Sequence, residues 1–377
     1  MTQHKPPQAV SLFDLIARSW TLGAEVRQVL FNANGSAVAA LLADRTLAFV
    51  PTEDSEPPDK RMRMELETGR TMIRAREKAL PTPILAEGTI ADQDAPMCRL
   101  GDQGFAFLHR TGSEIWKATA RGLTLRQTAA EGPVTAFTTL PTQNQIVFAL
   151  GERVTLVPAD ASDASHTAGL GHEVRRMAVS ADGQMLACWG PGHLSILAAD
   201  SLERLAQIEC DGEVNTLSWS QDNRWLAAGC GNKCVLLVDV PAGQSDRIVD
   251  YPAPVSDVAI SASAQALISS GAFRVVGWRL PDLPFGDHEG TPVESGKPGL
   301  TIVDHVAAHP KRDLCAVAYA NGLVTICQIG RRDELMLREG GGKPVTSMAW
   351  SDDGAHLAIG QADGTVSIAT FPKNMFK

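Results

Sequence analysis

The sequence lacks long apolar runs. Among its 377 residues, no stretch approaches the roughly 18 uninterrupted apolar residues that indicate a membrane-spanning helix. The first ten residues contain no apolar run of the length found in a secretory signal peptide. We therefore expect no membrane association and a cytoplasmic location.

The sequence also has few aromatic residues, and its cysteines give no sign of a disulfide framework. The seven cysteines are an odd number, and most lie within apolar, strand-like stretches. This predicts free thiols in a reducing compartment. Aromatic residues make up only 5% of the chain, whereas glycine is frequent, with 33 residues. Such a composition suits tight turns and closely packed sheets.

Positive charge is in deficit. Lys and Arg number 34 against 43 Asp and Glu, and the formal net charge is −9. Nucleic acids and anionic membranes select dense Lys and Arg patches, so the balance argues against both as partners while leaving room for a local basic patch. We expect a protein partner and a monomeric chain.

The sequence contains a repeated unit instead. Residues 345–370 are its clearest copy and serve as the template. Near-copies begin at Val26, Val134, Val174, Val214, Val255 and Ile302. From Val134 onward, consecutive copies start 40, 40, 41, 47 and 43 residues apart. A period near 40 with strand patterning inside each unit is typical of a β-propeller with four-stranded blades.

Three strands are predicted within the template, at Val345–Trp350, 356–360 and Thr365–Thr370. Turns separate them, and the second turn contains Asp363 and Gly364. Asp-Gly between two alternating runs is a strong hairpin signal, because glycine tolerates the positive φ that the turn needs. Trp350 recurs as Trp219 in an earlier copy, which indicates a core position.

These units resemble the WD-repeat β-propeller family, and the worn copies resemble a bacterial type. The resemblance covers residues 12–50 and 95–371. The Trp-Asp pair that typically ends the third strand survives only as Trp278 in one unit and Asp239 in another, and the Gly-His pair occurs once, at 171–172. The resemblance implies an all-β, closed propeller that acts as a platform for partners. Because the family's side-chain network is mostly missing, apolar packing must hold the blades.

The number of blades depends on the 108 residues between Val26 and Val134. Residues 97–109 are predicted to form the hairpin of the second and third strands of a further blade, with 84–90 as its first strand and 114–120 as its fourth. This gives eight blades in a single domain, 1–377. The alternative is seven blades with a long insertion, of a length unusual for a structureless segment.

The final unit, 345–371, contains only three predicted strands. Residues 12–22 lie where a fourth strand would be expected, so we predict that they pair beside Thr365–Thr370 and close the ring. Closure removes an open sheet edge, which would otherwise favour aggregation.

Residues 51–81 break the repeat pattern. An acidic, proline-containing stretch is followed by seven basic residues between 60 and 80, interspersed with Met62, Met64 and Met72. One interpretation is a protruding arm or short helix that grips a partner. The other is a charged outer strand and loop of the first blade.

The chain contains none of the nucleophile, phosphate-loop or zinc-protease motifs that mark enzymes. We therefore predict a non-catalytic scaffold that binds a protein through one face of the ring. The resemblance places residues near the start of each unit at the mouth of the central channel, where positive charge suits an acidic peptide. The candidate partner-binding residues are Arg27, Arg175, Arg176, Asn215 and Asp257; alternatively, they are solvated rim residues.

A small-molecule or metal-linked role is the alternative function, with a ligand in the central channel or zinc at a Cys and His cluster. The cluster would consist of Cys188, His193, Cys230 and Cys234, whose thiolates and imidazole are suitable zinc ligands. Buried cysteine is also a common apolar filler, and no partner pair completes the site at a recognisable spacing. We therefore predict no cofactor.

Overall fold

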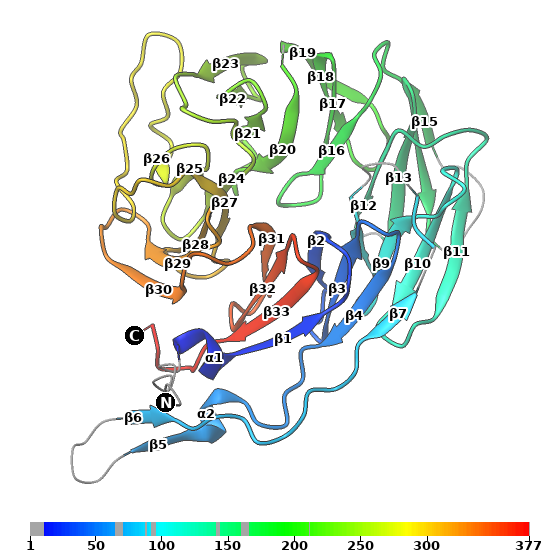
Figure 1. Cartoon of the computed structure of the whole chain (residues 1–377). Helices are drawn as coiled ribbons and strands as arrows, with labels where there is room; N and C mark the ends of the chain where they lie inside the picture. The colour runs from blue at the N-terminus through cyan, green and yellow to red at the C-terminus, as the bar shows by residue number, and fades with distance from the viewer. Residues whose placement is uncertain are drawn as a thin grey trace.

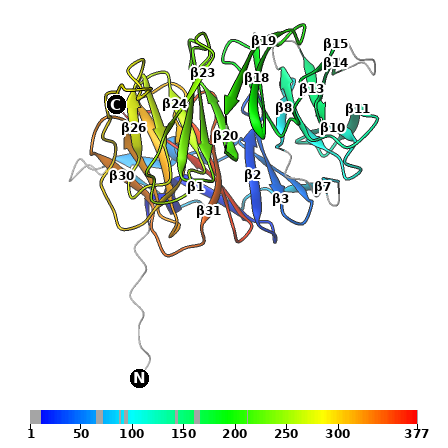
Figure 2. The same cartoon turned by 90° about the horizontal axis from the view of Figure 1, so that it is seen from above.

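The chain forms a closed ring of eight antiparallel sheets (Figure 1). In the view turned by 90°, the blades again stand side by side around the ring (Figure 2). The computed structural model describes residues 11–64, 71–86, 89–91, 96–140, 144–159, 166–210 and 212–376. Eight blades confirm the favoured prediction, and the seven-bladed alternative is wrong.

The blades are numbered from the N-terminal side, and each begins with its innermost strand. Blade 1 contains β2 (Val26–Phe31), β3 (Ala37–Leu42), β4 (Leu47–Pro51) and β7 (Ile84–Ala86). Blade 2 contains β8 (Cys98–Leu100), β9 (Gly104–Leu108), β10 (Glu114–Thr119) and β11 (Thr124–Ala129). Blade 3 contains β12 (Ala136–Leu140), β13 (Gln145–Leu150), β14 (Arg153–Pro158) and β15 (His166–Gly169). Blade 4 contains β16 (Arg176–Val179), β17 (Met185–Gly190), β18 (Gly192–Ala198) and β19 (Arg204–Cys210).

The second half of the ring repeats this meander. Blade 5 contains β20 (Val214–Trp219), β21 (Trp225–Cys230), β22 (Cys234–Asp239) and β23 (Gln244–Ile248). Blade 6 contains β24 (Val258–Ser261), β25 (Ala266–Ser269) and β26 (Val276–Arg279), with single bridges from Pro292 and Ser295 in the outer position. Blade 7 contains β27 (Val303–Ala308), β28 (Leu314–Tyr319), β29 (Val324–Gln328) and β30 (Glu334–Arg338). Blade 8 contains β31 (Val345–Trp350), β32 (His356–Gln361), β33 (Thr365–Thr370) and β1 (Ala17–Thr21).

Apolar packing between neighbouring blades holds the ring. The buried apolar side chains of the described residues form eight clusters, and each cluster joins two adjacent blades. The second and third strands supply most of them, as in β3 and β21, where every residue is buried. Indole hydrogen bonds add to the packing: Trp219 and Trp350 each donate Nε1–H to a main-chain carbonyl of the preceding blade, at 3.1 and 3.0 Å.

Each strand predicted for blade 2 takes a position in the sheet one earlier than the predicted position. Residues 84–90 were expected to form its first strand, but Ile84–Ala86 pairs with β4 as the outer strand of blade 1. The predicted hairpin within 97–109 is formed by the first and second strands, and 114–120 contains the third strand instead of the fourth. The cause is the brevity of β8, three residues before a turn, which left no recognisable alternation to mark a first strand.

The N-terminal segment closes the ring as predicted, but only in part. β1 pairs antiparallel with β33, from Ala17 opposite Ala369 to Thr21 opposite Thr365. The first half of the predicted strand, 12–16, is instead the helix α1 (Leu12–Ile16). A capping box explains the helix, because Ser11 and Asp14 satisfy each other's main-chain amides.

The described residues of the segment 51–81 include a helix and a two-stranded hairpin outside the blades, and Ile84–Ala86 supplies the outer strand of blade 1. That this arm grips a partner stays a prediction. A short helix, α2 (Pro58–Arg61), leads into a hairpin of β5 (Met62–Met64) and β6 (Thr71–Ile73). The hairpin lies outside the outer edge of blade 8, beyond α1 and β1 (Figure 1). Within the part of the chain that the structure describes, no helix is long and apolar enough to cross a membrane.

Candidate functional site

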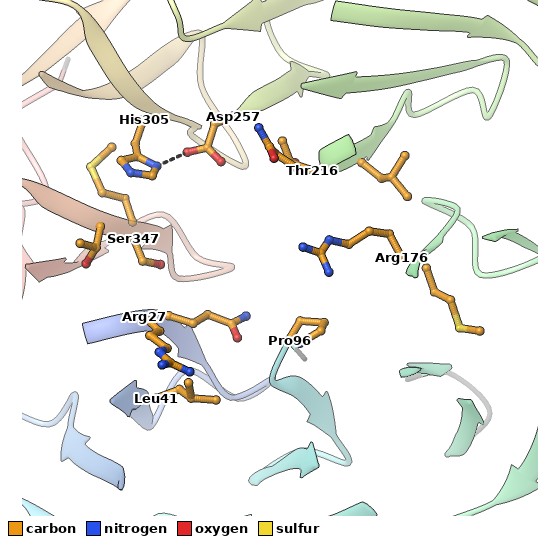
Figure 3. A pocket seen from close by; sticks show the side chains of 14 residues that line it. Arg27, Leu41, Pro96, Arg176, Thr216, Asp257, His305 and Ser347 are labelled. Carbon is orange, nitrogen blue, oxygen red and sulfur yellow. Dashed lines mark hydrogen bonds and ion pairs between the residues drawn. The ribbon is translucent and has the colours of Figure 1, made fainter. Parts of the chain in front are cut away.

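The innermost strands surround a cavity of about 500 Å³ at the mouth of the central channel (Figure 3). We call it the channel-mouth pocket. Blades 1, 4, 5, 7 and 8 contribute residues of their innermost strands, and blade 1 adds Leu41 from β3. Blade 6 contributes the residue directly before β24, and blade 2 contributes the loop before β8. The lining consists of Arg27, Gln28, Leu41, Pro96, Arg176, Met177, Asn215, Thr216, Leu217, Asp257, His305, Thr346, Ser347 and Met348.

Four of the five predicted partner-binding residues line this pocket: Arg27, Arg176, Asn215 and Asp257. The fifth, Arg175, lies outside it. Its exposed guanidinium pairs with the neighbouring Glu173 at 2.9 Å. The interpretation of Arg175 as a solvated rim residue therefore fits the structure better than a place in the pocket.

A shift in strand register accompanies the entry of consecutive residues into the pocket in three blades, whereas Arg176 and Met177 of blade 4 line it without one. In blades 1, 5 and 8, the pairing of the first two strands slips by one residue directly after the opening valine. Such a bulge sets two residues against one and breaks the usual alternation of faces. Consecutive residues consequently line the pocket together, such as Arg27 with Gln28 and Thr346 with Ser347. Arg175 precedes β16, whose pairing shows no such slip.

The pocket has separate basic and acidic sides. Arg176 reaches towards its centre, and Arg27 lies below the pair formed by Asp257 and His305 in the close-up view (Figure 3). Among the described residues, Arg27 has no hydrogen-bond or ion-pair partner for its guanidinium. Asn215 already has a partner within the protein, because its Nδ2 donates a hydrogen bond to the carbonyl oxygen of Val255 in blade 6 at 3.1 Å. Of these residues, Arg27 is therefore the most available to a ligand.

His305 was not anticipated from the sequence. Its Nδ1 lies 2.6 Å from a carboxylate oxygen of Asp257. Burial alone lowers the pKa of His305, but the hydrogen bond and charge of Asp257, with a smaller contribution from Asp304, outweigh it and leave the pKa raised. Below the raised pKa of His305, the imidazolium and the carboxylate of Asp257 therefore form an ion pair. This pair joins blades 6 and 7 across the pocket wall.

Other polar contacts around the pocket bind one blade to the next. Thr346 donates its hydroxyl to the carbonyl oxygen of Val26 at 2.5 Å, which connects blade 8 to blade 1. The amide of Gln28 contacts the main chain of Met97 twice, at 2.7 and 3.1 Å, and connects blade 1 to blade 2. These side chains perform a structural task, which leaves Arg27 as the group best suited to an incoming ligand.

The predicted Cys and His cluster is divided between two interfaces. Cys188 lies in the core between blades 3 and 4, whereas Cys230 and Cys234 lie in the core between blades 4 and 5. Burial raises the pKa of Cys188, and burial together with Cys234 raises that of Cys230 to about 12. Zinc binds the thiolate, so both environments disfavour ligation. Within the described residues, no group of three or more His, Cys, Asp or Glu is arranged to hold a metal ion.

The histidine of the Gly-His pair makes a buried polar contact within blade 4. The buried His172 places its Nε2 at 2.9 Å from the hydroxyl of Ser195, on the third strand of the same blade. Asp239, at the end of β22, pairs instead with Arg224 at 2.9 Å. The two motif residues therefore make separate local contacts in different blades.

Comparisons with known proteins agree with this architecture. The WD domain, G-beta repeat, matches residues 203–239, and the anaphase-promoting complex subunit 4 WD40 domain matches residues 306–374. No curated protein matches the chain significantly. The crystal structure of the computationally designed Ika8 protein is similar over 95% of this chain and 99% of its own, with a TM-score of 0.64 at 15% sequence identity. That likeness concerns the fold alone. Both family matches are WD-repeat domains and fall on blades of the eight-bladed ring, so the sequence comparisons and the fold together support a WD-repeat β-propeller.

Proposed function

We propose that this protein is a non-catalytic scaffold that presents the ring face around the channel-mouth pocket to a protein partner. WD40 domains generally mediate protein–protein interaction, and one matched family is named for a subunit of a complex. A preformed surface suits this role, because binding then costs less conformational entropy. A cytoplasmic location and a monomeric state remain predictions from the sequence.

The observation that carries the proposal is the pair of arginines in the pocket. Arg27 and Arg176 line the same cavity of a chain whose net charge is −9. A hydrogen bond to a charged group contributes about 1.5–3 kcal/mol, and a guanidinium binds a carboxylate in a two-pronged geometry. An acidic segment of the partner is the ligand that this arrangement favours. The carboxylate of Asp257 on the other side would limit how much negative charge the pocket accepts.

Charge reversal at the pocket tests the proposal. The tagged chain is purified from its own cells as the wild type and as the Arg27→Glu/Arg176→Glu variant. An Arg121→Glu/Arg331→Glu variant is the control, because these exposed arginines lie in turns between the third and fourth strands, at the far ends of the strands from the pocket. Each double variant changes the net charge equally.

We expect a stoichiometric protein partner with the wild type and the control, and at least tenfold less of it with the pocket variant. Thermal unfolding of all three proteins checks that the ring is intact. Recovery of no stoichiometric partner under gentle salt, or equal recovery with the pocket variant, would refute the proposal.

A further inference from the structure

The arm formed by α2, β5 and β6 belongs to none of the eight blades. Met62 pairs with Ile73, Arg63 with Met72 and Met64 with Thr71, and these two strands form a separate sheet. In the part of the chain that the structure describes, neither strand has a second neighbour, so both outer edges present unpaired main-chain groups. A two-stranded sheet is marginally stable by itself, which raises the question of what holds it in place.

Buried arginines fasten the base of the arm to the N-terminal closing segment. The guanidinium of Arg61, which is only 5% exposed, donates to the main-chain carbonyl oxygens of Leu15, Glu56 and Arg74. Three charge-assisted hydrogen bonds satisfy this buried charge. Because Leu15 lies in α1, the arm is tied directly to the segment that closes the ring.

A second set of buried hydrogen bonds also holds the base of the arm. Arg18 of β1 is 3% exposed and donates to the carbonyl oxygens of Pro51, Thr52 and Glu53. The carboxylate of Asp54 accepts a hydrogen bond from Arg76 at 2.5 Å. Arg76 follows β6, where the chain leads back from the arm to the ring. These contacts fix both ends of the arm against the ring. The hairpin is therefore held as a defined projection.

The projecting part exposes apolar and basic side chains together. Met64 is 68% and Met72 is 56% exposed, a large fraction for flexible apolar residues. Lys60, Arg63 and Arg74 are exposed as well and form no ion pair with any described residue. Methionine adapts its shape to different apolar partners, so the surface combines adaptable apolar contacts with exposed positive charge.

The charge of the arm contrasts with that of the remaining chain. Seven basic and three acidic residues give residues 60–80 a net charge of +4, so the rest of the chain, at a total of −9, carries −13. A negatively charged segment is repelled by most of the molecule and attracted to the arm. Opposite charge accelerates encounter and selects the partner.

We propose that the arm docks an extended acidic segment of a partner protein, which adds to the β5–β6 sheet as a third strand. Main-chain hydrogen bonds to an open edge would supply affinity, and alternate side chains would supply specificity. Apolar residues of the segment would contact Met64 or Met72, while its carboxylates would meet Lys60, Arg63 and Arg74. This surface is separate from the channel-mouth pocket.

A designed peptide tests the arm on the purified full chain. The probe is a fluorescent ten-residue peptide that alternates Glu and Val, and its counterpart carries Lys in place of Glu. Binding is measured by anisotropy to the wild type and to Lys60→Glu/Arg63→Glu/Arg74→Glu. The control is Arg121→Glu/Arg153→Glu/Arg331→Glu, which changes the net charge equally at exposed sites on other blades. Vesicles containing phosphatidylglycerol are tested in parallel.

We expect the acidic peptide to bind the wild type and the control, and to bind the arm variant at least tenfold more weakly. Hydrogen exchange should slow at main-chain amides of 62–64 or 71–73 when it binds. No binding, equal binding to the arm variant, or capture of vesicles but not of the peptide would overturn the proposal.

The pocket variant Arg27→Glu/Arg176→Glu separates the two surfaces. The arm should retain its affinity for the acidic peptide in that background. If the peptide instead loses its affinity only in the pocket variant, the arm proposal fails while the scaffold function stands.

Discussion

Deletion of residues 1–22 removes both α1 and the closing strand β1, and we expect it to unfold or aggregate the protein. Blade 8 would keep β31 to β33 but lose the strand that covers the edge of β33. The open edge would present unpaired main-chain groups to other molecules. The deletion would also expose the part of two interblade cores that Ile16 and Trp20 fill.

The magnitude follows from what the segment buries. Ile16 and Trp20 are 2% and 6% exposed, and burial of a large apolar side chain contributes about 1.5–3 kcal/mol. Loss of Arg18 would leave three main-chain carbonyls without their donor, at about 1–3 kcal/mol for each one that stays buried. With the lost strand pairing, the total is on the order of 10 kcal/mol, comparable to the whole stability of a typical domain, about 5–15 kcal/mol.

Thermal unfolding, followed by circular dichroism and light scattering, measures the effect. A chain lacking residues 1–9 is the control, because it retains every described residue, and its midpoint should match that of the full chain. The single change Trp20→Ala should be intermediate, at about 3–5 kcal/mol. If the 1–22 deletion melts at the same temperature as the 1–9 deletion, the ring does not depend on this strand and the reasoning is wrong.

Three further predictions concern the core, the pocket and the cysteines. Trp350→Phe removes an interblade hydrogen bond of 3.0 Å and should cost about 1 kcal/mol in urea unfolding; an unchanged midpoint would contradict this. The pKa of His305 is raised above 6.5 by Asp257 despite burial, so the pair stabilises the fold fully below pH 6.5 and less as pH rises through the raised value. His305→Gln should therefore destabilise the protein most at mildly acidic pH, and a pH-independent difference in urea midpoints would refute the pair's role. Cys230→Ser/Cys234→Ser should leave the zinc content by elemental analysis unchanged, because these thiols lie in an apolar core; loss of about one zinc per chain would overturn that expectation.

Much of the fold was predictable because the repeated unit specifies its own strands. In blade 8, the predicted strands agree with β31, β32 and β33 to within one residue. Alternating apolar residues and Asp-Gly turns act locally, so they are readable without knowledge of the ring. The eight-bladed count followed from the hairpin predicted within 97–109, even though the individual strands of blade 2 were misplaced.

The arm and the helix α1 were less accessible to sequence reasoning. A capping pair, Ser11 and Asp14, signals the helix, but its length of five residues is too short for a periodic pattern. The anchoring role of Arg61 depends on a carbonyl 46 residues earlier in the chain, Leu15. No local rule predicts which of seven basic residues is buried and which remain exposed, because that choice belongs to tertiary contacts.

The bulges after the opening valines determine which side chains the channel mouth presents. Strict alternation would send neighbouring residues of an inner strand to opposite faces, yet Asn215 and Thr216 both line the pocket. Blade 7 contains the same slip, after Val303, so its unit begins there, one residue later than the sequence pattern suggested. That error hid His305, which occupies the second position after the opening valine, as Asp257 does in blade 6. In the four blades with this slip, register at the start of the inner strand, more than the identity of any motif, therefore decides which side chains reach this site.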